Sequence, residues 1–378
     1  MSKLLTKAAV ACSRLLQTGS LGSGFTDALV VRCLNTQQEV LMNVFDRKAK
    51  LLQRERAAQG INGEDVSVYD YVKDEFGYRT AERIWDIKRR FGVVVDLGSG
   101  RGHVTKHICK DSVDLIYQCE FSPSLLDQAA VSPEVTTKKM VVDEENLPFE
   151  ENSIDMFISS LSLHWVNDLP GCLSQILRAL KNDCCIIGCM FGGDTLYQLR
   201  VSLQLAEIER EGGFAPHISP FTTANDLGSL LTRTGFTLLT IDMDEMTITY
   251  PSIFELMYDL KGMGENNCTW RRKPQLHRDT MLAAASIYKE MYGNDKGIPA
   301  TFQVINFIAW KPDPSQPKPA KRGSGQVSLK DLDKLDQLAK QMTMKQAEID
   351  GVKVVKLEAG EHDETKHDDT DPSKGKGQ

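Results

Sequence analysis

The clearest structural signal in the sequence is the stretch Val93-Val-Val-Asp96-Leu-Gly98-Ser-Gly100-Arg-Gly102-His-Val-Thr105. A short apolar run ends in an acid, and three alternate glycines lead into a segment that we expect to be a helix. Glycine adopts positive φ angles without strain and lets the backbone approach a ligand, because it has no Cβ. The start of the expected helix would add free N–H groups and the positive end of the helix dipole. The stretch therefore predicts a nucleotide-cofactor site at the carboxyl end of a strand.

Further apolar runs follow along the chain. We expect strands at Val93–Leu97, Leu115–Phe121, Lys139–Val142, Ile154–Leu161 and Cys184–Phe191. Most of these runs are rich in Val and Ile, and helix-length segments separate them, which is typical of a parallel sheet with helices on both faces. Before the first run, the residues from Val68 to Phe91 have helical spacing of their apolar side chains. The pattern therefore predicts an α/β fold preceded by helices.

Acidic side chains stand at the ends of the expected strands. Glu120 follows Asp96 by about 24 residues, where a carboxylate can accept hydrogen bonds from both hydroxyls of a ribose. Asp143 and Glu144 end the third run, and Ser160 lies near the end of the fourth. A surface ion pair for Glu120 and a turn-initiating role for Asp143 remain alternatives.

The glycine spacing separates two classes of cofactor. Counting Gly-x-Gly-x-x-Gly from Gly98 places His103 at the third glycine position, which disfavours NAD and FAD. The observed Asp-x-Gly-x-Gly-x-Gly instead resembles the first motif of class I S-adenosylmethionine-dependent methyltransferases. This resemblance implies a Rossmann-like fold of seven mostly parallel strands with an N-terminal helical extension, and places Asp143 beside the adenine amine. The residues implied to bind S-adenosylmethionine are Asp96, Gly98, Gly100, Gly102, Glu120, Asp143, Glu144 and Ser160.

Other runs resemble one family more closely. They are 43–56, 159–170, 190–197, 209–221, 262–268 and 277–285. Together they are similar to the assembly factor 5 family of mitochondrial NADH:ubiquinone oxidoreductase (complex I), over about residues 38 to 328. The resemblance implies an enzyme of the mitochondrial matrix, or of the matrix face of the inner membrane. It also implies hydroxylation of an arginine in a peripheral-arm subunit of complex I, and partnership with other assembly factors.

The residues themselves do not identify an oxygen-activating group. Hydroxylation by O₂ usually requires a redox metal, a flavin or a similar cofactor. We identify no iron facial triad in the globular core, and we interpret His103 and His107 as ordinary residues of the expected helix rather than metal ligands. Methyl transfer from S-adenosylmethionine and a non-enzymatic role as an assembly chaperone therefore remain alternative functions.

Four residues are candidates for contact with a substrate. His164 and Trp165 follow the fourth run, where a histidine can move a proton and a tryptophan can stack on a guanidinium. Packing of a helix against the sheet explains the same pair equally well. Asp194 and Tyr197 follow the fifth run and can contact an arginine substrate, although Asp194 also suits a helix N-cap. Residues 210–213 are interpreted as either a lid hinge or a plain loop.

Composition and charge exclude several classes of protein. The chain has 378 residues, of which 41% are hydrophobic, with a net charge of −7, which argues against an overall nucleic-acid binder. No run of about 18 uncharged apolar residues is present, so a membrane-spanning helix is not predicted. The nine cysteines include no Cys-x-x-Cys pair, which argues against zinc-ribbon and thioredoxin-type sites. Their odd number fits buried thiols in a reducing compartment.

The two ends of the chain differ from its centre. Residues 1–37 are basic, hydroxylated and amphipathic, which predicts a mitochondrial presequence, with a surface helix as the alternative. We expect a helical extension over 38–91 and a methyltransferase-type domain over 92–311. Residues 312–378 contain no Phe, Tyr or Trp and are interpreted as a polar tail, with a short helix, or a partner-binding helix, near 329–342.

Overall fold

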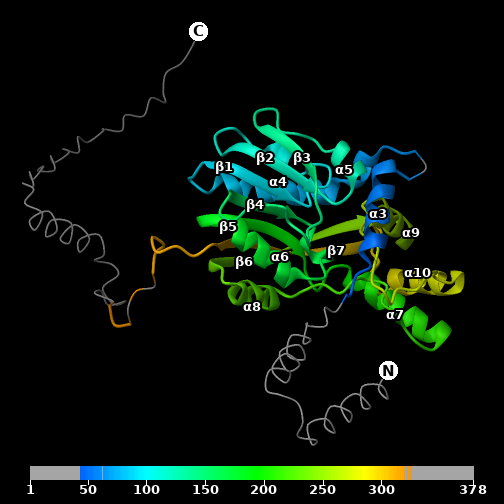
Figure 1. Cartoon of the computed structure of the whole chain (residues 1–378). Helices are drawn as coiled ribbons and strands as arrows, with labels where there is room; N and C mark the ends of the chain where they lie inside the picture. The colour runs from blue at the N-terminus through cyan, green and yellow to red at the C-terminus, as the bar shows by residue number, and fades with distance from the viewer. Residues whose placement is uncertain (1–42, 62, 319, 321, 325–378) are drawn as a thin grey trace, which may run out of the picture. The chain divides into compact units, whose positions relative to one another are not determined.

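The computed structural model describes residues 43–61, 63–318, 320 and 322–324. The chain divides into two compact units, Met1–Gln316 and Pro317–Gln378, and the described helices and strands all belong to the first. The centre of this first unit is a seven-stranded sheet in the order β3-β2-β1-β4-β5-β7-β6 (Figure 1). The strands are β1 (Phe91–Leu97), β2 (Val113–Glu120), β3 (Thr136–Val141), β4 (Ile154–Ser160), β5 (Leu180–Phe191), β6 (Thr237–Tyr250) and β7 (Ile298–Trp310).

The strand directions confirm the predicted mostly parallel sheet. Strands β1 to β5 pair in parallel, whereas β7 runs antiparallel to both of its neighbours, β5 and β6. The five strands expected from the sequence are all present, with ends that differ by a few residues. The carboxyl ends of β1, β2 and β4 therefore meet at one edge, where parallel sheets commonly place their sites.

Alternate side chains of the strands enter two separate hydrophobic layers. Val95 of β1 packs in one layer with α6 and α8, and Val94 packs on the opposite face with α4. The helices are α3 (Arg47–Gln59), α4 (Tyr71–Trp85), α5 (Pro123–Asp127), α6 (Leu169–Ala179), α7 (Tyr197–Glu211), α8 (Ala224–Thr234), α9 (Ile253–Gly262) and α10 (Arg278–Tyr292). Helices α3, α7, α9 and α10 gather beyond one end of the strands (Figure 1).

Two expected helices differ from the structure. Helix α4 ends at Trp85, and residues 86–90 form a turn and an extended connection, because Phe91 already pairs with Val113 of β2. After the glycine loop, only the 3₁₀ turn Thr105–His107 forms in place of the expected helix. The few residues between this turn and β2 must also return the chain to the start of the sheet, which leaves no room for a longer helix.

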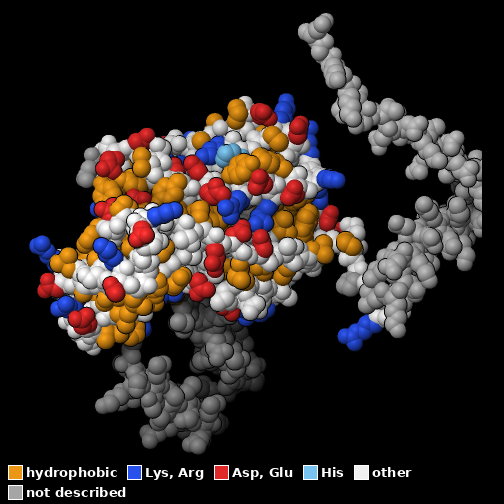
Figure 2. Space-filling view, turned by 180° about the vertical axis from the view of Figure 1, so that it is seen from behind, with side chains coloured by type: hydrophobic (Ala, Val, Ile, Leu, Met, Phe, Trp, Pro, Cys, Tyr) orange, Lys and Arg blue, Asp and Glu red, His pale blue; other side chains and the backbone are white. Residues whose placement is uncertain are grey.

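The charges on the surface and the state of the cysteines agree with what the composition predicts. Figure 2 shows charged side chains of both signs interspersed with hydrophobic ones. Of the seven cysteines that the structure describes, all are free thiols and all but Cys109 are buried, as predicted. Within the described residues, no helix has both the length and the apolar character that a membrane span requires. The predicted presequence and the predicted helix near 329–342 lie outside the described residues.

Candidate active site

The glycine loop has the backbone conformation that its sequence predicts. Gly98, Gly100 and Gly102 have φ angles of +71°, +54° and +79°. An added Cβ would lie 2.1 Å from Oγ of Ser162 at Gly98, and 2.2 Å from the carbonyl oxygen of Ala130 at Gly102. At Gly100 its nearest neighbour would be the ring of His103, at 3.4 Å. Packing within the protein therefore requires glycine at Gly98 and Gly102, whereas a Cβ at Gly100 would make only a van der Waals contact with His103.

Two buried carboxylates lie beside this loop and share one cation. Glu120, at the end of β2, and Glu144, in the turn after β3, are 1% and 0% exposed. Nη1 of Arg54 donates to Oε1 of Glu120 at 2.8 Å and to Oε1 of Glu144 at 2.9 Å. Nη2 of Arg54 donates to Oγ of Ser162 at 3.0 Å, and this hydroxyl donates to Glu144 at 2.8 Å. We call Glu120, Glu144 and Ser162 the carboxylate cage.

Helix α3 carries the cation because of its residue spacing. Arg47 and Arg54 are seven residues apart, which places them two turns apart on the same face of the helix. The side chain of Asp46 caps the first turn by accepting from the N–H of Ala49 at 3.1 Å. Nη2 of Arg47 donates to Asp143 at 2.7 Å and also pairs with Glu144. One face of α3 therefore covers the ends of β2 and β3.

The electrostatics favour the charged forms of both Glu144 and Arg54. Burial acts to raise the pKa of Glu144, but the charges of Arg54 and Arg47 outweigh it and lower this pKa to about 2. Burial acts to lower the pKa of Arg54, but Glu120 and Glu144 raise it above its ordinary value. For Asp96, burial raises the pKa to about 7, opposed by the hydrogen bond from Thr105 at 2.7 Å.

Contacts within the protein occupy part of the crevice in which the sequence predicts S-adenosylmethionine. Oε2 of Glu120 accepts from the N–H of Gly100 at 2.9 Å, and Oε1 accepts from the N–H of Ser122 as well as from Arg54. Few acceptor positions therefore remain for ribose hydroxyls, and Ser162 lies directly against Gly98. Moreover, only a 3₁₀ turn follows the loop, so the expected helix dipole is missing there. The assignment of these residues to that cofactor stays a prediction.

His164 and Trp165 lie in the 3₁₀ turn Leu163–Trp165, and both are buried. Among the described residues, the ring nitrogens of His164 have no hydrogen-bond partner, and Oε2 of Glu265 lies 3.6 Å from Nε2. Burial lowers the pKa of His164. Nε1 of Trp165 donates to Glu265 at 2.9 Å, and Nζ of Lys50 lies 3.2 Å from the centroid of the tryptophan ring. Because Lys50 covers this ring, the contacts favour the packing role for Trp165.

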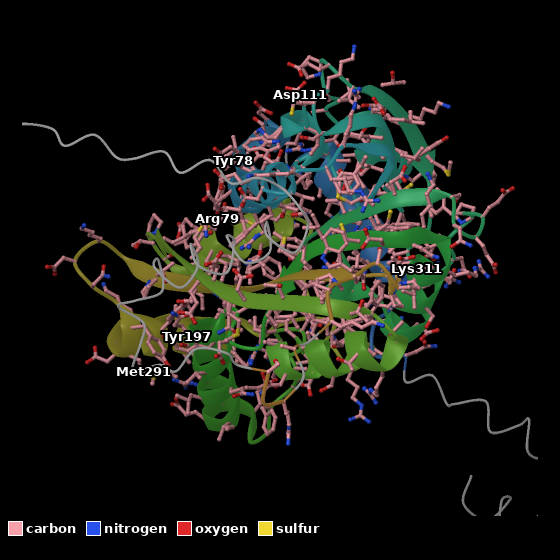
Figure 3. The ribbon with its side chains drawn as sticks, turned by 90° about the vertical axis from the view of Figure 1, so that its left-hand side faces the viewer. Tyr78, Arg79, Asp111, Tyr197, Met291 and Lys311 are labelled. Carbon is pink, nitrogen blue, oxygen red and sulfur yellow. The ribbon has the colours of Figure 1, made fainter. Side chains whose placement is uncertain are left out.

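The side chains of Ser160, Asp194 and Tyr197 contact residues outside the carboxylate cage. Ser160 contacts Sγ of Cys189 at 3.3 Å. Asp194 is exposed and accepts from Gln303 at 3.3 Å, and the suggestion that it caps α7 is wrong, because Leu196 is the N-cap residue. Tyr197 is 40% exposed, and Figure 3 shows it on the same side of the molecule as Met291 of α10. The structure thus gathers Glu120 and Glu144 but not Asp194 and Tyr197.

Metal-ligand side chains form one group of three within the described residues. Asp70, Asp74 and His103 offer ligand atoms within 4.8 Å of one another. Arg101 already pairs with Asp70, and Lys106 with Asp74 at 2.5 Å, so both acids have counter-ions. The iron-triad spacing His-x-Asp does occur in the core, at His277–Asp279, contrary to the interpretation of the sequence. There His277 is the N-cap residue of α10 and Asp279 lies in its first turn, outside that group of three.

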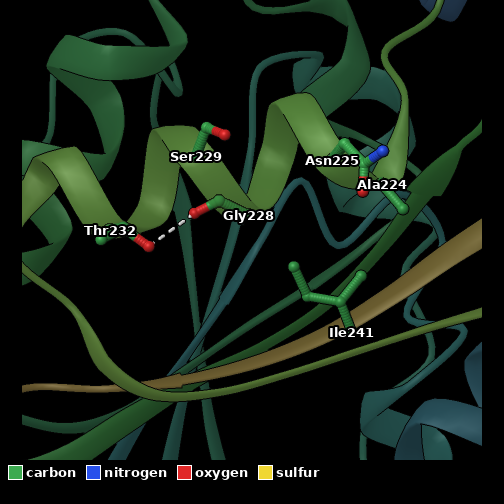
Figure 4. A pocket seen from close by; sticks show the side chains of 6 residues that line it. All are labelled: Ala224, Asn225, Gly228, Ser229, Thr232 and Ile241. Carbon is green, nitrogen blue, oxygen red and sulfur yellow. Dashed lines mark hydrogen bonds between the residues drawn. The ribbon is translucent and has the colours of Figure 1, made fainter.

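Several cavities lie away from the glycine loop. One of about 600 Å³, between α8 and β6, is lined by Ala224, Asn225, Gly228, Ser229, Thr232 and Ile241 (Figure 4). None of these side chains titrates, and Oγ1 of Thr232 donates to the carbonyl of Gly228 at 2.8 Å. A second, of about 330 Å³, lies between α7, α9 and α10 and has Glu265 in its wall. The first therefore offers no titratable acid or base for chemistry.

Comparison with known proteins identifies related chains. A methyltransferase domain family matches residues 95–187. The protein named "Arginine-hydroxylase NDUFAF5, mitochondrial" of Danio rerio is 53% identical over 79% of this chain and 92% of its own. The Homo sapiens protein of the same name is 52% identical over 79% of this chain and 85% of its own. The malonyl-[acyl-carrier protein] O-methyltransferase of Gallionella capsiferriformans is 30% identical over 72% and 93%.

Solved structures are more distant. A putative methyltransferase from Bacillus halodurans is 15% identical and covers 62% of this chain and 99% of its own, with a TM-score of 0.44. A phosphoethanolamine N-methyltransferase 2 of Haemonchus contortus, solved with S-adenosyl-L-methionine, is 16% identical over 66% of this chain and 57% of its own, with a TM-score of 0.41. The identity to the Danio rerio and Homo sapiens proteins, in contrast, exceeds 50% and extends over 79% of this chain. The chain therefore belongs to the family of mitochondrial arginine-hydroxylases that bear the name NDUFAF5.

Proposed function

We propose that this chain hydroxylates an arginine side chain of another protein in mitochondria. The observation that carries the proposal is the 52–54% identity, over more than three quarters of the chain, to proteins named arginine-hydroxylase. The buried acids of the carboxylate cage support it, because carboxylates are the natural partners of a guanidinium group. We place the activity in the matrix or at the matrix face of the inner membrane.

We further propose that the substrate is a peripheral-arm subunit of complex I, met together with other assembly factors. This part rests on the family resemblance of the sequence runs between residues 43 and 285. Hydroxylation from O₂ inserts one oxygen atom into a C–H bond and reduces the other to water, with two electrons and two protons from a reductant. Such chemistry is normally supplied by a bound metal or organic cofactor rather than by side chains. The protein's contribution is to bind and orient the arginine and to exclude bulk water.

Methyl transfer from S-adenosylmethionine is the second candidate function. The glycine loop and the O-methyltransferase relative at 30% identity favour it. It requires the cofactor's ribose to reach Glu120, whose acceptor atoms are engaged by Arg54, Ser122 and Gly100. An assembly chaperone without turnover is the non-enzymatic alternative. The 52–54% identity to proteins named arginine-hydroxylase favours hydroxylation over methylation.

One measurement distinguishes these functions. The candidate subunits of complex I are isolated from mitochondria with and without this chain, and their intact masses and arginine-containing fragments are compared. A gain of one oxygen atom on an arginine that depends on the chain is the expected result. A gain of one methylene group would replace the proposal with methyl transfer. Subunits of unchanged mass that still assemble would support the chaperone.

A further inference from the structure

A hollow on the surface lies outside both the glycine loop and the carboxylate cage. It has a volume of about 640 Å³ and is bordered by α7, by the loop 214–220, by residues 269–271 and by Asn43. Two large aromatic side chains on its border are exposed, Phe214 at 68% and Trp270 at 60%. Exposed aromatic side chains around a concave surface are typical of a site that binds another protein. We call this hollow the aromatic groove.

The charge of the aromatic groove is opposite to that of the chain as a whole. Fourteen described residues line it, and none of them is Asp or Glu, although the chain has a net charge of −7. Arg271 makes no hydrogen bond or ion pair within the described residues. The guanidinium of Arg200 donates only to two backbone carbonyls, at 3.1 and 3.4 Å. His217 already pairs with Glu207 at 3.0 Å. The groove therefore suits an occupant with negative charge.

A buried hydroxyl group in the wall of the groove also lacks a partner. Thr269 is 5% exposed, and its Oγ1 has no hydrogen-bond partner among the described residues. A buried hydroxyl without a partner costs free energy, so most such groups in proteins are paired. A carbonyl or carboxylate oxygen of an occupant can accept this hydrogen bond.

Helix α7 extends the apolar surface beyond the groove. Leu205 and Ile208, three residues apart on the helix, are 42% and 52% exposed. Gln204, in the wall of the groove, is four residues from Ile208 and therefore lies next to it on the helix surface. A surface helix usually has one apolar face, and α7 already buries such a face in the core through Leu199 and Leu203. Its second apolar face is thus available to a partner.

The aromatic groove lies next to two of the candidate substrate-contact residues. Residues 217–219 line both the groove and the cavity of about 330 Å³ that has Glu265 in its wall. Glu265 accepts a hydrogen bond from Trp165 and lies 3.6 Å from Nε2 of His164. A protein segment in the groove therefore brings its neighbouring residues toward the turn that follows β4.

Shape and charge together select a segment of another protein as the occupant. A lipid surface is flat on this scale and would meet Phe214 and Trp270 only at their tips, whereas a peptide segment can fill the hollow. The chain's own residues before Asn43 carry more basic than acidic side chains, so they do not complement Arg200 and Arg271. An acidic segment of a partner does.

We propose that the aromatic groove docks an acidic segment of the protein substrate that also carries apolar side chains. Its carboxylates pair with Arg200 and Arg271, and its apolar side chains pack on Phe214 and Trp270. This inference rests on the proposed function, which requires a protein substrate, and goes beyond it by naming the surface that holds that protein.

Photo-crosslinking in mitochondria tests the occupant directly. The full chain is made with Phe214→p-benzoylphenylalanine, and a matched control chain carries Phe254→p-benzoylphenylalanine. Phe254 is an exposed side chain of α9 outside the groove. Mass spectrometry of the crosslinked peptides then identifies what lies against each position.

The expected result is a crosslink from position 214, and not from position 254, to an acidic segment of a complex I subunit. The inference is overturned if position 214 crosslinks instead to lipid, to a basic segment, to a second copy of the chain or to the chain's own residues before Asn43. Absence of any protein crosslink at position 214 would overturn it as well.

Substitutions in the groove provide an independent measurement. Trp270→Ala combined with Arg271→Glu removes one apolar contact and reverses one charge, and should lower the yield of the position-214 crosslink by at least about tenfold. The matched control combines Phe254→Ala with Arg233→Glu, the same kinds of change at exposed positions of α9 and α8 outside the groove. Equal yields for the two double variants would overturn the inference. Should the groove variant fail to fold in circular dichroism, the crosslinks of the otherwise unaltered chain still decide.

The docking surface and the proposed function fail in different ways. If position 214 crosslinks to an acidic segment of a subunit that gains no oxygen atom, the docking surface stands and the proposed function fails. If a subunit gains an oxygen atom but does not crosslink to position 214, the proposed function stands and the docking surface fails.

Discussion

Replacing Glu144 with glutamine tests the ionised network that holds α3. Glutamine keeps the shape of the side chain and removes the charge that faces Arg54 and Arg47. The two arginines lower the pKa of Glu144 from its ordinary 4.5 to about 2. A shift of this size corresponds to a contribution of about 3 kcal/mol to the free energy of unfolding at neutral pH. The variant should therefore be less stable than the wild type by about this amount at pH 7.

The pH dependence of this loss has a definite sign. The pKa of Glu144 is lower in the folded state than in the unfolded chain, so its contribution is complete above a pH of about 4.5. The contribution disappears as the pH falls toward about 2, where the folded protein also takes up the proton. The stability difference between wild type and Glu144→Gln should accordingly be constant from pH 7 to 5 and shrink below that.

Urea unfolding followed by circular dichroism at several pH values measures this difference. The matched control is Glu151→Gln, the same chemical change at a side chain that is 69% exposed and lies 4.0 Å from Arg178. Exposed ion pairs contribute little, so the control should unfold like the wild type. The reasoning is refuted if Glu144→Gln costs no more than the control, or if its cost does not change between pH 7 and pH 3.5.

Two substitutions and one fusion provide further tests. Gly98→Ala should lower the melting temperature far more than Gly100→Ala, because the new Cβ at position 98 would collide with Ser162. An alanine at position 100 adds mainly the strain of a left-handed backbone, about 1 kcal/mol. Equal losses of melting temperature in calorimetry would contradict this packing of the loop. His164→Phe should change the free energy of unfolding by no more than about 1.5 kcal/mol, since three aromatic rings surround the imidazole. Full hydroxylation by this variant would assign His164 to packing, and loss of hydroxylation at unchanged stability would assign it to the reaction. Residues 1–37 fused to a fluorescent protein should direct it to mitochondria, and cytosolic fluorescence would count against the presequence.

Local sequence patterns predict most of the sheet and only part of the site. The runs that become β1, β2, β4 and β5 are recognisable because parallel strands inside the sheet are buried on both faces and need apolar residues. The edge strand β3 is mostly exposed, and only its last residues give an apolar signal. Strand β6 is not recognisable in this way, since every second residue is exposed and Asp242, Asp244 and Glu245 interrupt it. The helix expected after Gly102 does not form, because glycine spacing reports the loop conformation and not the length of the segment that follows.

In the carboxylate cage, too, the sequence predicts some of the residues and not others. Glu120 and Glu144 follow from their positions at strand ends, which a sequence reveals. Arg54 does not, because α3 contains many charges and an arginine that will be buried looks like one that stays in water. Its burial depends on acids that are 66 and 90 residues away in the chain. Only the fold brings the cation and the two acids together.

The glycine loop also contacts and positions residues of the carboxylate cage. Its close backbone approach at Gly98 is made to Ser162, a member of the carboxylate cage, and the N–H of Gly100 donates to Glu120. Two of the three cage residues are thus positioned by the loop itself. The motif that predicts a nucleoside cofactor thus also orients two groups that accept hydrogen bonds from the Arg54 guanidinium. The loop therefore stabilises the covering helix α3 as well as shaping the crevice, because the acceptors that it positions are those that hold Arg54.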